Sequence, residues 1–141
     1  MTYDANNIFA KILRGEIPSH KIYEDEHTLA FMDVMPQVDG HCLVIPKAPS
    51  RNLLDADDAT LASLMPVVRL VAAAAMAAFG KGGCQIRQYN EAAAGQPVFH
   101  LHVHVLPLDE GQPVKAHSGQ MADHAVLAKH AEMIRAKLQA A

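Results

Sequence analysis

The stretch His100-Leu101-His102-Val103-His104-Val105-Leu106-Pro107 decides how the rest of this chain is interpreted. Histidines alternate with aliphatic residues in it, and side chains of a β-strand point alternately to the two faces of the sheet. The alternation therefore predicts a strand with three histidines on one face and Leu101, Val103 and Val105 buried on the other. Three adjacent imidazoles would repel one another if all were protonated, which suggests that they share a function.

Apolar alternation and turn residues divide the whole chain into five strands and three helices. Strands are expected at 21–24, 28–33, 41–46, 84–89 and 100–107. Helices are expected at 8–13, at 56–79 with a kink near Pro66, and at 123–138. Because a loop of about eight residues joins the last two strands, we expect them to pair antiparallel. The order predicts an α+β fold with a five-stranded, mostly antiparallel sheet, one short helix, one long helix and a C-terminal helix.

Length and composition limit the class of protein. A chain of 141 residues fits one domain, with a core at about 6–107 and a tail and helix at 108–141. A formal net charge of −3 without a basic run argues against a nucleic-acid partner. The N-terminus has no signal-peptide pattern, and the longest apolar run, about ten residues, is shorter than the ~20 of a membrane span. Cys42 and Cys84 lie outside any paired motif, so free thiols in a reducing cytoplasm are expected.

Three interpretations of the histidine strand stay open on the residues alone. A His-x-His pair can chelate a metal, although three alternate positions spread over roughly 13 Å do not easily share one ion. A polar strand face held by hydrogen bonds is the second interpretation. The third is catalysis, in which a neutral imidazole attacks a phosphoryl group while a protonated neighbour holds the phosphate oxygens and protonates the leaving group.

The chain as a whole resembles the histidine triad family, whose signature alternates three histidines with apolar residues as 100–106 does. Residues 7–18 are similar to the opening helix of that family, and 30–36 with 40–47 are similar to its central block. Asn90-Glu91 and Gly95-Gln96 also stand where the family has them. The resemblance covers roughly residues 6–107 and is greatest to the Hint branch of nucleotide phosphoramidase-like proteins.

The resemblance implies a function for each matching residue. His102 would be the nucleophile that attacks the α-phosphorus of a nucleotide, and His104 would bind the α-phosphate and assist the leaving group. His100 and His41 would orient the site, and Asp33 would accept hydrogen bonds from the ribose. The base would lie in an apolar slot formed by Ile8, Phe9, Ile12, Phe31 and Val34. The phosphate would be surrounded by Asn90, Gly95 and Gln96. On the residues alone, the apolar positions are more often plain core, and an aspartate such as Asp33 is usually a turn or cap residue.

The implied reaction is hydrolysis or transfer at the α-phosphate of a purine nucleoside phosphoramidate, such as AMP-NH2 or AMP-lysine, through a nucleotidyl-histidine. The alternatives are a dinucleoside polyphosphate hydrolase and a nucleotide-binding interaction protein with little catalysis. The family also forms homodimers, so the expected partners are an AMP-type substrate and a second copy of the chain. His117, in the polar tail, is a further residue that could approach a substrate.

Two departures from the family pattern change the expectations. Many relatives carry Cys-x-x-Cys at the opening helix, which with two histidines holds a structural zinc. Asn7 and Ala10 stand at those positions here, so we expect no zinc and no other cofactor. Pro97 stands where some relatives have a hydroxyl residue near the leaving group, and proline has no N–H or O–H to donate.

Overall fold

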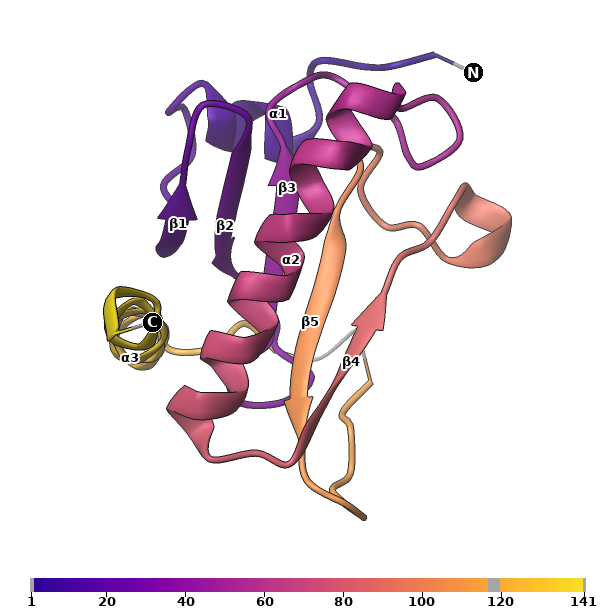
Figure 1. Cartoon of the computed structure of the whole chain (residues 1–141). Helices are drawn as coiled ribbons and strands as arrows, with labels where there is room; N and C mark the ends of the chain where they lie inside the picture. Colours follow the sequence, from indigo (N-terminus) through magenta and orange to yellow (C-terminus); the bar gives the residue numbers. More distant parts are fainter. Residues whose placement is uncertain (1, 117–119, 141) are drawn as a thin grey trace.

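A single antiparallel sheet organises the molecule, which a computed structural model describes over residues 2–116 and 120–140 (Figure 1). Its strands are β1 (Lys21–Glu24), β2 (Thr28–Met32), β3 (Cys42–Pro46), β4 (Gly83–Arg87) and β5 (Val103–Leu108). Their order across the sheet is β1-β2-β3-β5-β4, and all four neighbouring pairs are antiparallel. The predicted α+β fold with a five-stranded sheet is confirmed. The tail residue His117 lies outside the described residues, so its expected approach to a substrate stays a prediction.

Three helices and one short 3-10 turn surround the sheet: α1 (Ile8–Leu13), α2 (Asp58–Phe79), α3 (His124–Ala140) and η1 (Ala92–Ala94). The side chain of Asn7 accepts a hydrogen bond from the Ala10 N–H and so caps α1. Asp57 caps α2 in the same way, and α2 ends at Gly80, whose φ of +62° is the left-handed conformation that glycine adopts without strain. Pro66 lies inside α2 as predicted.

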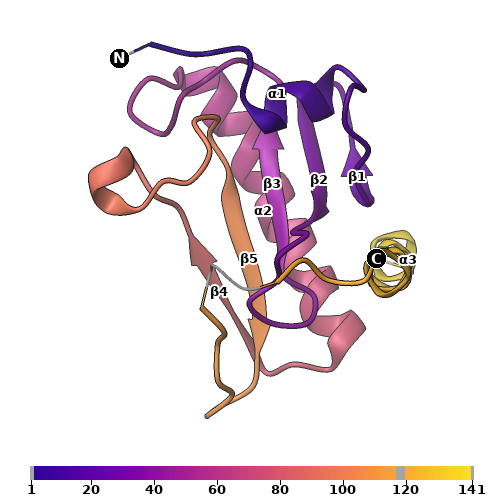
Figure 2. The same cartoon turned by 180° about the vertical axis from the view of Figure 1, so that it is seen from behind.

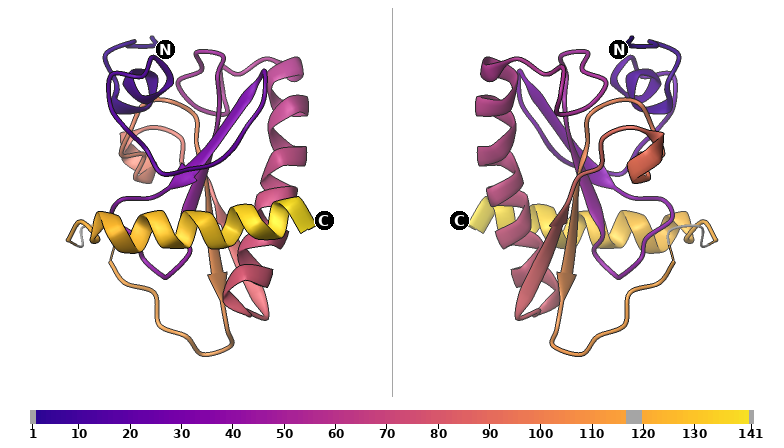
Figure 3. Two further views of the ribbon diagram at one scale, coloured as in Figure 1. Left: turned by 90° about the vertical axis from the view of Figure 1, so that its left-hand side faces the viewer. Right: turned by 90° about the vertical axis from the view of Figure 1, so that its right-hand side faces the viewer.

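The two faces of the sheet carry separate hydrophobic clusters. The cluster on the α2 side contains Val44, Val103 and Val105 from the strands and the buried face of α2, and α3 packs against it. The other cluster lies on the α1 side and consists of Phe9, Leu29, Phe31, Leu43 and Ile45, with Ile12, Leu13 and Val98 packed against it. Figure 2 and Figure 3 show α1 and α2 on opposite sides of the sheet.

By length and composition α2 is apolar enough to cross a membrane. Core helices of globular proteins can have the same length and apolar composition. The residues that α2 buries are Leu64, Val67, Val68, Val71, Ala72, Ala74 and Ala75. Its apolar composition is thus used in packing against the sheet.

The histidine strand is shorter than predicted, since β5 begins at Val103. Pairing between β3 and β5 extends only from Val44↔Val103 to Cys42↔Val105. Before Val103 the backbone leaves the ladder, because the Leu101 N–H donates to the Ser50 carbonyl at 2.8 Å instead of to a strand. Leu101, Val103 and Val105 are still buried in the α2-side core, as the alternation predicted.

Candidate active site

His102 is held by a hydrogen bond that fixes which ring nitrogen carries the proton. Its Nδ1 lies 2.7 Å from the carbonyl oxygen of His100, and a carbonyl only accepts hydrogen bonds. Nδ1 is therefore protonated, and in the neutral ring the lone pair is on Nε2. The ring of Phe9 packs edge-on against the imidazole with the centroids 4.9 Å apart. A neutral imidazole fixed in this tautomer is suited to attack through Nε2.

His41 and His104 form a buried pair of imidazoles joined by a hydrogen bond. The Gln37 N–H donates to His41 Nδ1 at 3.0 Å, so the proton of neutral His41 is on Nε2. His41 Nε2 lies 2.9 Å from His104 Nδ1, which must accept, and the proton of neutral His104 is then on Nε2. Asp33 Oδ2 lies 3.4 Å from His41 Nε2, and Asp33 Oδ1 accepts from the Met35 N–H at 2.8 Å. A carboxylate in this position favours an extra positive charge on the two imidazoles.

Possible metal ligands include this pair of imidazoles. Ligand atoms of Asp33, His41 and His104 all lie within 4.8 Å of one another, and two histidines with one carboxylate are a common zinc set. The two ring nitrogens face each other along a hydrogen bond, however, so an ion would have to displace the proton between them. We therefore interpret the cluster as a proton relay.

The zinc position that the family resemblance implies does not fit a metal here. The Asn7 side chain is used to cap α1, and Ala10 offers no ligand. Both nitrogens of His100 already have partners: Nε2 lies 2.8 Å from the Pro46 carbonyl, and Nδ1 lies 2.6 Å from the Tyr3 hydroxyl. The expected lack of a structural zinc stays a prediction.

His100 is a neutral, buried residue that supports its neighbours. Burial lowers the pKa of His100, and the hydrogen bond to the Pro46 carbonyl opposes that shift only in part. The ring joins the end of β3 to the N-terminal segment, while the backbone carbonyl holds His102. His100 thus contacts the residues that surround it and places its carbonyl against His102, and the orienting role that the family resemblance implies for it stays a prediction.

The imidazoles of His102 and His104 lie next to each other, with ring centroids 5.0 Å apart. Tyr89 packs edge-on against His104 at 5.7 Å. We did not predict Tyr89, although the predicted pairing of 84–89 with the histidine strand would have placed it there. The structure therefore adds one aromatic residue to the wall beside the histidines.

The apolar slot predicted for the base is only partly assembled. Phe9, Ile12 and Phe31 belong to one cluster on the α1 side, and Phe9 touches His102. Ile8 is 53% exposed, and Val34 packs against the cluster on the α2 side. The structure thus brings three of the five predicted residues into one cluster, and of these Phe9 contacts His102.

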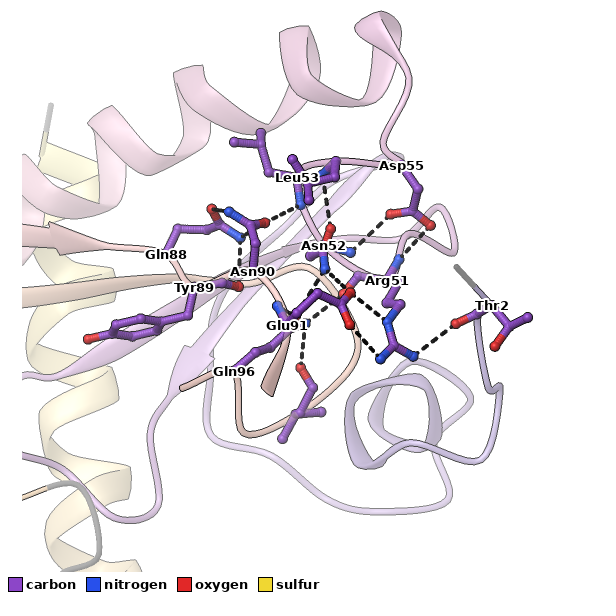
Figure 4. A network of polar contacts seen from close by, with 12 residues as sticks. Thr2, Arg51, Asn52, Leu53, Asp55, Gln88, Tyr89, Asn90, Glu91 and Gln96 are labelled. Carbon is purple, nitrogen blue, oxygen red and sulfur yellow. Dashed lines mark hydrogen bonds and ion pairs between the residues drawn. The ribbon is translucent and has the colours of Figure 1, made fainter. Parts of the chain in front are cut away.

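The side chain of Gln96 makes four hydrogen bonds, which join the loop between β4 and β5 to the segment between β3 and α2 (Figure 4). Its Nε2 donates to the Arg51 carbonyl at 2.7 Å and to the Val98 carbonyl at 3.0 Å. Its Oε1 accepts from the Glu91 N–H at 2.8 Å and from Asn52 Nδ2 at 3.1 Å. All the hydrogen-bonding positions of the amide are used. The Gln96 side chain therefore holds the loop in shape, and the predicted place of Gln96 beside a phosphate stays a prediction.

The other two residues predicted around the phosphate also have partners in the loop. Asn90 Oδ1 accepts from the Leu53 N–H at 3.0 Å, and the two amides of Asn90 and Gln88 bind each other. Gly95 has a φ of +89°, and its N–H donates to the Ala92 carbonyl at 3.0 Å. The predicted phosphate contacts of Asn90 and Gly95 stay predictions, and the structure gives both residues a part in the turn.

Glu91 holds the loop through an ion pair that we did not predict. Its carboxylate receives two hydrogen bonds of 2.8 Å from the Arg51 guanidinium and one of 2.6 Å from Asn52. The hydrogen bond from Arg51 lowers the pKa of Glu91. Glu91 also has a φ of +73°, which is unusual outside glycine and typical of functional loops. No sequence motif that we recognised marked Arg51 or Asn52, since their partners lie about 40 positions away.

Replacing Gln96 with leucine is expected to lower the free energy of unfolding by about 2–4 kcal/mol, because buried donors and acceptors lose their partners. Urea denaturation measures the change. Gln120→Leu is the matched control, since Gln120 is exposed, lies outside the helices and strands, and should change stability little. Equal effects of the two substitutions would contradict the assigned role of Gln96.

Comparison with known proteins identifies the family. The HIT domain profile matches residues 14–111. A HIT-like protein of Bartonella henselae is 48% identical and has a TM-score of 0.91, with 96% of this chain and 99% of that chain covered. The adenosine 5'-monophosphoramidase HNT1 of Saccharomyces cerevisiae is 38% identical over 106 residues, which cover 75% of this chain and 65% of that protein. A zinc-bound histidine triad family protein of Mycobacterium smegmatis is 32% identical, with a TM-score of 0.85 over 96% of this chain and 94% of that chain. The chain therefore belongs to the HIT, or histidine triad, family.

Proposed function

We propose that the protein is a nucleotide-binding hydrolase that cleaves purine nucleoside phosphoramidates at the α-phosphate through a nucleotidyl-His102 intermediate. The observation that carries the proposal is the hydrogen bond of His102 Nδ1 to the His100 carbonyl, because it leaves the lone pair on Nε2. The monophosphoramidase name of the yeast relative supports the substrate class.

In the first step, His102 Nε2 forms a bond to the α-phosphorus, and the phosphorus–nitrogen bond of the substrate breaks. The electron pair of that bond stays on the leaving nitrogen, which takes one proton and departs as an amine. We assign that proton to His104 Nε2, donated when the His41–His104 pair holds one extra proton. Asp33 beside His41 stabilises the charge of this protonated pair.

In the second step, water attacks the phosphorus, and the bond to His102 Nε2 breaks. AMP leaves, and the proton lost by water returns to the His41–His104 pair. The His100 carbonyl stabilises the positive charge on His102 in the intermediate by accepting from Nδ1. Neither step needs a metal ion in this mechanism.

Three assays separate this proposal from its alternatives. Turnover of adenosine phosphoramidate is measured against turnover of a diadenosine polyphosphate under the same conditions, and AMP binding is measured by calorimetry. Faster turnover of the phosphoramidate is expected. Faster turnover of the polyphosphate would favour the dinucleoside polyphosphate hydrolase, and tight AMP binding without turnover of either compound would favour a nucleotide-binding interaction protein.

We also propose a homodimer that forms along β4. This strand is at one end of the sheet, and edge strands present unpaired backbone groups to other chains. Ile86 of β4 is 45% exposed, and Met65 and Leu70 of α2 are 51% and 42% exposed, which gives an apolar surface for a second copy. Light scattering should report twice the chain mass, and Ile86→Lys should give a monomer. A monomeric wild-type protein at tens of micromolar would contradict the dimer.

The two cysteines support an expected location in the cytoplasm. Cys42 and Cys84 are both free thiols. Burial strongly raises the pKa of the Cys42 thiol, so this residue is an unreactive part of the core. A chain with unpaired thiols suits a reducing compartment.

A further inference from the structure

We propose that Tyr3 is a positioning residue of the active site, which acts on the nucleophile His102 through His100. The inference rests on the proposed function, because it assigns a residue to that same reaction. Tyr3 lies outside the segment 14–111 that matches the HIT domain. The N-terminal segment would thus complete a site that the family domain alone leaves without this support.

A continuous set of hydrogen bonds leads from Tyr3 to the nucleophile. The Pro46 carbonyl accepts from His100 Nε2 at 2.8 Å, so the proton of neutral His100 is on Nε2. His100 Nδ1 then carries a lone pair, and the Tyr3 hydroxyl at 2.6 Å must donate to it. The carbonyl of the same residue, His100, accepts from His102 Nδ1 at 2.7 Å. Tyr3 thereby stabilises the tautomer that the Pro46 carbonyl selects and holds in place the residue that orients His102.

The rings of Tyr3 and His100 also pack edge-to-face, with the centroids 5.6 Å apart and an angle of 66° between the planes. His100 is buried, whereas Tyr3 is partly exposed. The N-terminal segment therefore forms part of the cover over His100. The Tyr3 hydroxyl makes the polar contact of this cover, and a phenylalanine at position 3 would keep the ring contact without it.

Two arginines hold the N-terminal segment in place. Arg51 Nη1 donates to the Thr2 carbonyl at 3.1 Å (Figure 4), and Arg14 Nη1 donates to the Ala5 carbonyl at 2.8 Å. Arg51 also pairs with Glu91 in the loop between β4 and β5. The segment is thus fixed on both sides of Tyr3, and one of its two anchors belongs to the network that shapes the loop.

Loss of the Tyr3 hydroxyl should change the protonation of His100. A hydroxyl that donates to Nδ1 stabilises the neutral ring, so its removal leaves that lone pair available to a proton. The groups that contact His100 are the Tyr3 hydroxyl, the Pro46 carbonyl and His102. Arg51, which holds the Thr2 carbonyl next to Tyr3, is paired with Glu91, so their charges offset each other. Protonated His100 would add a positive charge beside the nucleophile and disturb the carbonyl that holds it.

The test compares Tyr3→Phe with Tyr23→Phe in the full chain. Tyr23 is a matched control because its hydroxyl donates to Asp25 at 2.8 Å and is also partly buried, but it has no link to His100. In Tyr3→Phe, kcat for adenosine phosphoramidate should fall about 5-fold, as expected for one lost hydrogen bond, with little change in KM. The acid limb of the kcat profile should move to higher pH by about half a unit, and neither effect should appear in Tyr23→Phe.

Nitrogen NMR of His100 gives a readout that does not depend on activity. The wild-type ring should show a neutral Nε2–H tautomer, and Tyr3→Phe should take up a proton at higher pH than wild type does. Unchanged kcat, pH profile and His100 titration in Tyr3→Phe would overturn the inference. Wild-type protein without turnover would instead overturn the proposed function, while the NMR titration would still decide whether Tyr3 controls His100.

Discussion

Replacement of His102 with alanine is expected to lower turnover of adenosine phosphoramidate by roughly 10⁴-fold or more, because the covalent route is lost with its nucleophile. The fold should survive, since His102 lies before β5 and contributes no backbone pair to the sheet. The contacts that disappear include the edge-on packing against Phe9, the packing against His104 and the hydrogen bond to the His100 carbonyl. The change should therefore act on the chemical step much more than on stability.

Two measurements check this result. A rapid acid quench of wild-type protein with substrate, followed by mass spectrometry, should show one nucleotide bound to the peptide that contains His102. The same quench of His102→Ala should show no adduct on any peptide. His27→Ala is the control, because the His27 side chain is 64% exposed in the turn between β1 and β2 and should leave turnover unchanged. Full activity of His102→Ala would refute the mechanism.

Replacement of Gly40 with alanine is expected to destabilise the protein by about 2–4 kcal/mol. A Cβ at this position would lie 2.8 Å from two ring carbons of Phe79 and 2.9 Å from the Pro107 ring. The φ of +87° is also unfavourable for any residue with a side chain. Chemical denaturation measures the loss, and turnover should fall as well because His41 is the next residue.

Gly15→Ala separates the crowding at Gly40 from backbone strain. Gly15 has a similar φ of +78°, but a Cβ there would meet nothing within 4 Å. This substitution should therefore cost only about 1 kcal/mol, which is the conformational term alone. Equal losses in the two variants would show that contact with Phe79 and Pro107 adds nothing at Gly40.

Local patterns in the sequence were sufficient for most of the fold. Helix α1 spans the predicted residues 8–13, and β1 and β2 lie within one residue of the ranges that the apolar alternation predicted. The central position of β3 follows from its continuous apolar run, all of which is buried. These signals lie within a few residues of the elements that they specify, which is why the sequence alone reveals them.

The parts that were not predicted depend on contacts between distant residues. The early end of the β3–β5 ladder depends on Ser50, and the loop before His100 depends on Arg51 and Asn52. The histidine signature identified three of the four imidazoles, and the resemblance of the central block added His41. The separation into His102, held by the His100 carbonyl, and the buried pair of His41 and His104, oriented by Gln37, was not predicted. Hydrogen bonds over such separations have no periodic signal in a single sequence.

The position of the histidines relative to the sheet has a consequence for hydrogen exchange. His104 is in the central strand pair and His41 directly precedes it, so their amides should exchange only when the whole domain unfolds. His102 and the loop at 88–102 lie outside regular strands and should exchange through smaller, local openings. This loop can thus open locally while the buried pair of His41 and His104 keeps its geometry.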